Sequence, residues 1–249
     1  MSHNHIDHNS DLKKILDMNY QIENNIVYVI DKETYSSYIK DLESVEKKCR
    51  DNVLKIFPDA SINERTLSLK IKDKGELKLV VCPTDHNCEG SFGFKLFLGE
   101  KVLGYTSDTR YTNEISDFFK DSDIIITNIS ETNREDLMLI ELKKTHLGIY
   151  GVSELLKEMK KNKVLCLLTE FYGGFGDIRI EMADIVREYV GNDKLDIVPV
   201  DIGMTYFLDH ETFLCNNCDG MIDRKKKVIA RMGKESKRLF CLCENCLYM

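Results

Sequence analysis

The chain has 249 residues, 43% of them hydrophobic, which is enough to bury one sizeable core together with a small appended module. Its formal net charge of −7 argues against a general DNA-coating role, because such proteins depend on overall positive charge, but it leaves room for a local basic groove. We expect no membrane partner, since no apolar run is long enough to span a bilayer and no signal-peptide pattern is present.

The first polar segment concentrates metal-ligating side chains: His3, His5, Asp7 and His8 lie within six residues. Neutral imidazole together with carboxylate suits zinc, manganese or iron. On a turn that leaves a strand, His3 and His5 would face one metal while Asp7 and His8 face a neighbouring one, as in a dinuclear hydrolytic site. A purification tag would be a homopolymeric His run and a core segment would be apolar, so we interpret these residues as ligands.

The segments that follow alternate between helical and strand patterns, which predicts an α/β fold. Residues 201–208 return as a short edge strand. The other expected strands cover 26–30, 66–72, 77–82, 94–98, 102–105, 123–128, 164–168 and 196–200, and the expected helices cover 11–18, 33–57, 112–120, 151–161 and 178–190.

The segment 3–8 resembles the HxHxDH signature of the metallo-β-lactamase-fold metallo-hydrolases, and Ser2 and residues 9–12 resemble its usual context. The resemblance implies an αββα sandwich of two sheets with outer helices. It also implies several strands before the signature, whereas this chain starts on it. We therefore expect an N-terminally incomplete sandwich with an open sheet edge and an uncovered apolar face.

Three explanations for the missing strands compete. The reading frame begins at an internal methionine of a longer protein, which we favour; another chain donates the strands; or two copies form a homodimer and cover each other's exposed sheet. A frayed terminus would hold His3 and His5 poorly, because ligand geometry needs a fixed surrounding.

Two later segments resemble further ligand positions of the family. Asp85-His86-Asn87, after an apolar run, resembles the loop that carries the third histidine of the first metal, and residues 104–109 resemble the GYTGDT segment, which makes Asp108 the bridging aspartate. Taken alone, His86 is equally an ordinary loop residue and Asp108 a turn or cap residue. Their order along the chain favours the metal interpretation for both.

Two other positions depart from the family pattern. Glu170 follows the apolar strand 164–168 where the family usually places a histidine of the second metal; a carboxylate there favours a harder metal such as manganese or iron, unless it is simply solvated. His146 resembles the catalytic histidine of the transfer-RNA 3′-processing branch, although its surroundings match poorly and a helix-capping role is nearly as well supported.

Three glycines among aromatic residues, at 171–177, precede Arg179. They would permit close backbone approach to a substrate, whose phosphate or carboxylate the guanidinium would bind, or they would simply form the turn before the next helix. Arg179, His146 and Asp7 are accordingly the candidate catalytic residues.

Four cysteines close the chain as two CxxC pairs, Cys215/Cys218 and Cys243/Cys246, a spacing typical of a structural zinc site of the zinc-ribbon kind. Cys241 offers a competing thiol. A disulfide would need an oxidising compartment, whereas nine cysteines with several unpaired suit a reducing cytoplasm. The basic residues between the pairs, from Lys225 to Arg238, form either a solvated face or a nucleic-acid contact.

These observations divide the chain into a hydrolase domain at 1–210 and a zinc module at 211–249. The leading hypothesis is a hydrolase with two divalent metals, zinc or else manganese or iron, that acts on a phosphodiester of a nucleotide or RNA. The alternatives are a hydrolase of a small acyl substrate, such as a lactone or thioester, and a zinc-stabilised binding protein with a defective active site. The metal-ligand hypothesis comprises His3, His5, Asp7, His8, His86, Asp108 and Glu170.

Overall fold

The computed structural model describes residues 26–29, 36, 53–56, 65–71, 75–88, 90–130, 146–170, 178–231 and 238–247. The signature at residues 3–8, the expected helix at 11–18 and the glycine-rich segment at 171–177 lie outside these residues.

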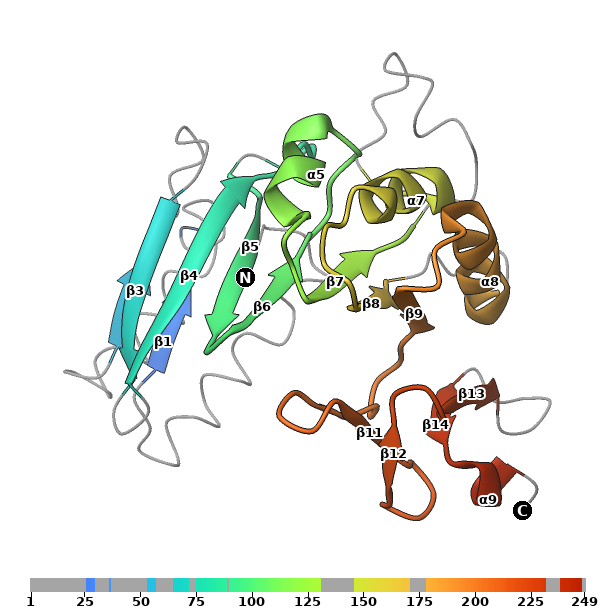
Figure 1. Ribbon diagram of the computed structural model, residues 1–249. Coiled ribbons are helices and arrows are strands. Elements are labelled where there is room, and N and C mark those ends of the chain that lie inside the picture. Colours follow the sequence, from blue (N-terminus) through green and yellow to red (C-terminus); the bar gives the residue numbers. More distant parts are fainter. Residues whose placement is uncertain are drawn as a thin grey trace.

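A seven-stranded mixed sheet forms the centre of the molecule, with its strands in sequence order across the sheet. Neighbours from β3 to β6 pair antiparallel, and neighbours from β6 to β9 pair parallel, so β4, β6, β7, β8 and β9 all run in one direction (Figure 1). The strands are β3 (Arg65–Ile71), β4 (Gly75–Pro83), β5 (Phe92–Leu98), β6 (Lys101–Tyr105), β7 (Ile124–Asn128), β8 (Val164–Thr169) and β9 (Leu195–Pro199).

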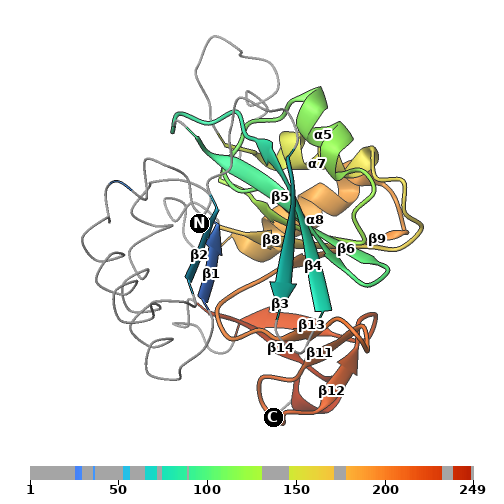
Figure 2. The same cartoon turned by 90° about the vertical axis from the view of Figure 1, so that its left-hand side faces the viewer.

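Three helices cover one face of this sheet: α5 (Asn113–Phe119), α7 (Ile149–Lys157) and α8 (Arg179–Val190) (Figures 1 and 2). α5 starts at Thr112, whose hydroxyl accepts the N–H of Ile115, and α8 ends at Gly191 in the left-handed conformation. Gly104 of β6 makes room for α5, because a Cβ there would lie 2.8 Å from Phe119 Cδ1. This face is the larger core.

A row of apolar side chains crosses the opposite face, which we call the second face, and ends in one carboxylate. Strand register places one residue of each strand directly beside the next: Leu67, Leu79, Leu96, Leu103, Ile124, Leu165 and finally Asp196. Adjacent residues point to opposite faces of a sheet, which explains why β7 and β8 are continuous apolar runs buried on both sides.

The C-terminal module, residues 206–247, packs on the parallel half of the second face (Figure 1). It contains a three-stranded sheet, a two-stranded sheet and a short helix. The edge strand expected at 201–208 is shorter, since only Tyr206–Phe207 form a strand, which lies at the edge of the three-stranded sheet and pairs with Phe213 and Thr212. Its elements are β10 (Tyr206–Phe207), β11 (Thr212–Leu214), β12 (Met221–Asp223), β13 (Val228–Arg231), β14 (Leu239–Leu242) and α9 (Glu244–Leu247).

Two further short strands, β1 (Ile26–Val29) and β2 (Val53–Ile56), pair parallel with each other. β2 contradicts the last turn of the helix expected at 33–57, since Val-Leu-Lys-Ile suits a short strand and is rich in β-branched residues. Among the described residues, the seven-stranded sheet is the one large sheet of the mixed α/β fold, and none of their helices is long and apolar enough to cross a membrane.

Candidate metal centre

The carboxyl ends of four strands meet at one edge of the large sheet, and the polar residues of the candidate centre follow them. His86 lies just beyond β4, Asp108 beyond β6, and Glu170 directly after β8, while Asn128 is the last residue of β7. Because these four strands run in the same direction, their ends deliver these side chains to a common place. Such an edge is the usual ligand site of open α/β sheets.

Two of the predicted ligands, His86 and Asp108, converge with the predicted catalytic residue His146. The ligand atoms of His86, Asp108 and His146 all lie within 4.8 Å of one another. Asp108 Oδ2 is 3.3 Å from His146 Nε2 and 3.9 Å from His86 Nε2, and the two imidazole rings meet edge to face with their centroids 5.0 Å apart. Asp108 is only 4% exposed, so the cluster is shielded from bulk water on its carboxylate side.

Asn128 connects the two carboxylates of the centre. Its Nδ2 group donates to Asp108 Oδ1 at 2.8 Å and to Glu170 Oε2 at 2.5 Å. Asn128 is 2% exposed, and among the described residues its Oδ1 atom has no hydrogen-bond partner. The interpretation of the sequence had not identified Asn128; its signal was a polar residue at the end of the apolar run Ile124–Ile126.

Backbone and side-chain bonds hold the His86 loop against the Asp108 loop. The Arg110 guanidinium bonds Asp85 Oδ2 at 2.5 Å, the Arg110 N–H donates to the Asp85 carbonyl at 3.0 Å, and the Asp85 N–H donates to Thr109 Oγ1 at 3.1 Å. These contacts fix the position of His86, which follows Asp85 directly.

Two non-glycine residues at the centre adopt the left-handed backbone conformation. Ser107, just before Asp108, has φ 57°, and Glu170 itself has φ 55°. This region is costly for residues with a Cβ, and such strain concentrates at functional sites. Both residues lie at points where a strand ends and its next side chain is turned toward the cluster.

The donor set fits a divalent metal. Two imidazoles and a carboxylate are ligands of zinc, iron and manganese, and the buried Asn128 oxygen beside them has lone pairs to offer to a water or cation. Glu170 reaches this centre through Asn128, which places a second carboxylate next to the first. The predicted ligands His3, His5, Asp7 and His8 lie outside the described residues, so their part in the site stays a prediction.

Arg179, a predicted catalytic residue, is the first residue of α8 and pairs with Asp201 at 2.7 Å. Asp201 Oδ2 also accepts the N–H of Leu239 in the C-terminal module at 2.9 Å. Asp201 thereby connects Arg179 of α8 with Leu239 of the C-terminal module. Its role toward a substrate stays a prediction.

The four cysteines of the two CxxC pairs come together in the C-terminal module. The thiols of Cys215, Cys218, Cys243 and Cys246 lie within 4.8 Å of one another, and Cys218 Sγ is 3.8 Å from Cys243 Sγ. Burial raises the pKa of the Cys215 thiol, but backbone N–H groups of Cys243, Asn217 and Cys218 outweigh it and lower that pKa to about 6. Amide groups directed at sulfur are suited to a thiolate ligand.

Cys241 is not part of this group. It is fully buried, burial raises the pKa of its thiol to about 11, and its side chain belongs to the apolar contact between module and sheet. A neutral, inert thiol in that position acts as a small apolar residue.

Several of the basic residues between the CxxC pairs bond within the chain. Arg224 and Lys227 both bond Asp196 of β9, and Arg231 pairs with Glu181 of α8. Lys225 and Lys226 remain exposed. Intramolecular pairing lowers the charge that this segment offers to a nucleic acid, which weakens the expectation of contact there.

A family model and several solved structures match the chain. Residues 1–167 match the model of the "Beta-lactamase superfamily domain" family. No curated protein matches the chain in sequence.

Solved structures of low sequence identity share the fold. The metallo-β-lactamase fold protein YhfI from Bacillus subtilis has 15% identity and a TM-score of 0.57 over 77% of this chain and 70% of its own. The short form of human tRNase Z has 14% identity and a TM-score of 0.51 over 69% of this chain and 71% of its own. A long-form RNase Z from yeast has 18% identity and a TM-score of 0.53 over 68% of this chain, which spans 27% of the yeast protein.

Proposed function

Because the chain belongs to the β-lactamase superfamily domain family, we propose that it is a metal-dependent hydrolase with a dinuclear centre that acts on a phosphodiester. The observation that carries the proposal is the convergence of His86, Asp108 and His146 at the carboxyl edge of the sheet, where Asn128 joins Asp108 to Glu170. Polar residues that only face solvent are hydrogen-bonded by water. A buried amide that bonds two carboxylates, as Asn128 does, indicates that their positions matter.

The first metal would be held by His3, His5 and His86, and the second by Asp7, His8 and Glu170, with Asp108 between them. When bound, the metals would supply a water activated at neutral pH and positive charge to balance the transition state. Zinc fits the imidazoles, whereas manganese or iron fits the additional carboxylate of Glu170.

Side chains of the protein would orient the metal ligands and protonate the leaving group of the substrate. His146 lies close enough to His86 and Asp108 to reach a metal, but we assign it to catalysis. One-third exposed beside Asp108, it would donate a proton to a leaving oxygen, and Asp108 would hold its imidazole in position. Asn128 would hold the carboxylates of Asp108 and Glu170 in fixed orientation. Asp7 and Arg179 complete the proposed catalytic set.

A phosphodiester is the substrate class that we favour. The yeast and human structural neighbours are named as an RNase Z and a tRNase Z. The position of His146 in the sequence resembles that of a catalytic histidine in that branch. A nucleotide or an RNA end is accordingly the proposed substrate.

The proposal has two further components. One is a structural zinc on the four module cysteines. The other is a reducing, cytoplasmic location, which suits the eight free thiols that the structure describes.

The test is hydrolysis by protein loaded with zinc, manganese or iron, assayed on bis(p-nitrophenyl) phosphate and on a matched panel of lactones and thioesters. We expect turnover of the phosphodiester, and an Asp108→Ala variant should lose at least roughly 100-fold of it, since even outer partners of a metal ligand matter on that scale. The control is Asp117→Ala, an exposed carboxylate on α5. Turnover of acyl substrates alone would replace the phosphodiester assignment, and no turnover by metal-loaded protein would favour a binding protein.

A further inference from the structure

The C-terminal module and the strands of the catalytic centre share one apolar core. Ile124 of β7, Leu165 of β8 and Val198 of β9 pack on Phe213, Ile222 and Leu242 of the module. Leu103 of β6 lies against the same cluster, next to Ile124 in the sheet register. The strands β6, β7 and β8 lead to Asp108, Asn128 and Glu170, so the module supports the strands that position the centre.

Two of the four clustered cysteines are members of this apolar core. Cys215 is fully buried and Cys246 is 7% exposed, and both side chains belong to the cluster that includes Leu165. The cysteine group and the contact with the sheet are therefore one continuous structure. A change that moves these two sulfur atoms also moves the surface that covers the second face.

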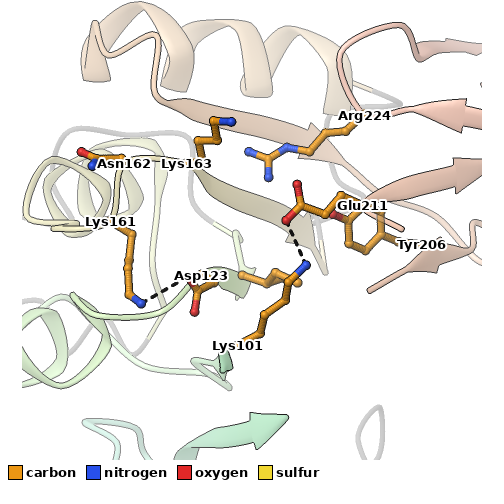
Figure 3. A pocket seen from close by; sticks show the side chains of 9 residues that line it. Lys101, Asp123, Lys161, Asn162, Lys163, Tyr206, Glu211 and Arg224 are labelled. Carbon is orange, nitrogen blue, oxygen red and sulfur yellow. Dashed lines mark hydrogen bonds and ion pairs between the residues drawn. The ribbon is translucent and has the colours of Figure 1, made fainter. Parts of the chain in front are cut away.

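Polar contacts complete the boundary between module and sheet. Asp196, at the end of the row across the second face, accepts from both Arg224 and Lys227 of the module. Lys101 of β6 bonds the Leu208 carbonyl and Glu211. A polar cavity of about 230 Å³ remains in the boundary, where Lys101 and Glu211 face each other (Figure 3).

The module has little secondary structure with which to stay folded alone. Its strands are two to four residues long and its helix has four residues. Its two CxxC turns are joined by Asn216, whose N–H donates to the Cys241 carbonyl at 2.9 Å while its Oδ1 accepts the Cys241 N–H at 2.7 Å. Units of this size generally need a metal or disulfides to fold, and the cysteines described here are free.

We propose that zinc bound by Cys215, Cys218, Cys243 and Cys246 holds the module over the second face, so that occupancy of this site sets the rigidity of β6, β7 and β8. Four thiolates are a closed tetrahedral zinc site with no position for a substrate. Loss of this zinc unfolds the module, exposes Leu103, Ile124 and Leu165 to water, and loosens the strand ends that present Asp108, Asn128 and Glu170. The module thus covers the parallel half of the second face.

The test compares the wild-type protein with its Cys218→Ser variant by zinc content, thermal unfolding and hydrogen exchange of the β6–β8 amides. Cys218 is the exposed member of the group, so serine there removes a ligand without leaving a cavity in the apolar core. We expect the variant to lose about one zinc per chain, to unfold roughly 10 °C lower, and to exchange faster throughout β6–β8. Lys226→Ala, an exposed substitution in the same module, should change none of these.

A reversible experiment covers the case in which Cys218→Ser does not fold. A chelator titration of wild-type protein, followed by re-addition of zinc alone, should lower and then restore the protection of the β6–β8 amides. Loss of the cysteine-bound zinc with unchanged exchange in β6–β8 would overturn the proposal, as would a Cys218→Ser protein that keeps its full zinc content. Asp108→Ala should retain the module zinc, so that failure of the hydrolase proposal and failure of this one give different results.

Discussion

The Nδ2 atom of Asn128 lies 2.8 Å from Asp108 Oδ1, and the same nitrogen donates to Glu170 at 2.5 Å. One buried amide thereby fixes two carboxylates that come from different strands. Hydrogen bonds to charged groups are stronger than neutral ones, and a buried partner that loses them is left unsatisfied.

Replacement of Asn128 by Ala is expected to weaken metal binding at the centre by roughly 10- to 100-fold, because the two carboxylates lose the group that orients them. Isothermal titration with manganese or zinc measures this directly and does not depend on turnover. Asn113→Ala, an exposed asparagine on α5, is the matched control. Unchanged affinity in Asn128→Ala would mean that the amide serves packing alone.

Replacement of Glu170 by His tests which metal the centre prefers. The family pattern that the sequence resembles has a histidine at this position, and imidazole suits zinc better than manganese or iron. We expect competition binding to shift toward zinc in Glu170→His, and Glu170→Gln to weaken every divalent ion by removing the charge. A wild-type protein that already rejects manganese would contradict the assignment of Glu170 as a ligand.

Continuous apolar runs explain why the central strands could be predicted from the sequence. β7 and β8 are buried on both faces, so each is an uninterrupted apolar segment that ends in polar residues. His86 and Asp108 were predicted from motifs, and the structure brings them together with His146. Asn128 could not be found in that way, because no motif marked it and its importance comes from its two bonds across strands.

Contacts between segments that are distant in the sequence explain where the structure differs from the fold expected from the sequence. The apolar face was expected to lie uncovered, but the module covers its parallel half. Only tertiary packing brings Phe213 and Ile222 to Ile124, and no periodicity within the chain states that pairing. The helix expected at 33–57 extended too far because Val53 fitted an apolar helical face, whereas Val53–Ile56 pairs with β1.

Replacement of Gly104 by Ala tests the packing of α5 on the sheet. A Cβ at this position would lie 2.8 Å from Phe119 Cδ1 and 2.9 Å from Ser122 Oγ, and Phe119 is fully buried. We expect overpacking to lower the free energy of unfolding by about 1–3 kcal/mol. Urea unfolding measures the change; Gly104→Ala combined with Phe119→Leu should recover part of it if the clash is the cause.

The link through Asp201 gives stability a defined dependence on pH. Burial raises the pKa of Asp201, but the Leu239 N–H, the Arg179 guanidinium and the Ile202 N–H outweigh it and lower that pKa below its usual value. A carboxyl whose pKa is lower in the folded than in the unfolded protein stabilises the fold at pH values above the unfolded pKa of about 3.9, and that stability disappears as pH falls through the folded pKa. Asp201→Asn should therefore lower the free energy of unfolding at pH 7 by about 1–3 kcal/mol and should flatten the loss of stability below about pH 4.

Urea unfolding of both proteins between pH 3 and pH 7 measures this difference. Asp209→Asn, which changes an exposed carboxyl in the same region, is the control and should follow the wild-type curve. If the free energy of unfolding fell with pH equally in Asp201→Asn and wild type, Asp201 would not couple the module to α8. A difference that is large at pH 7 and vanishes at the acid end is the expected result, because protonation of Asp201 weakens its bonds to Arg179 and Leu239 in the wild type just as the amide does in the variant.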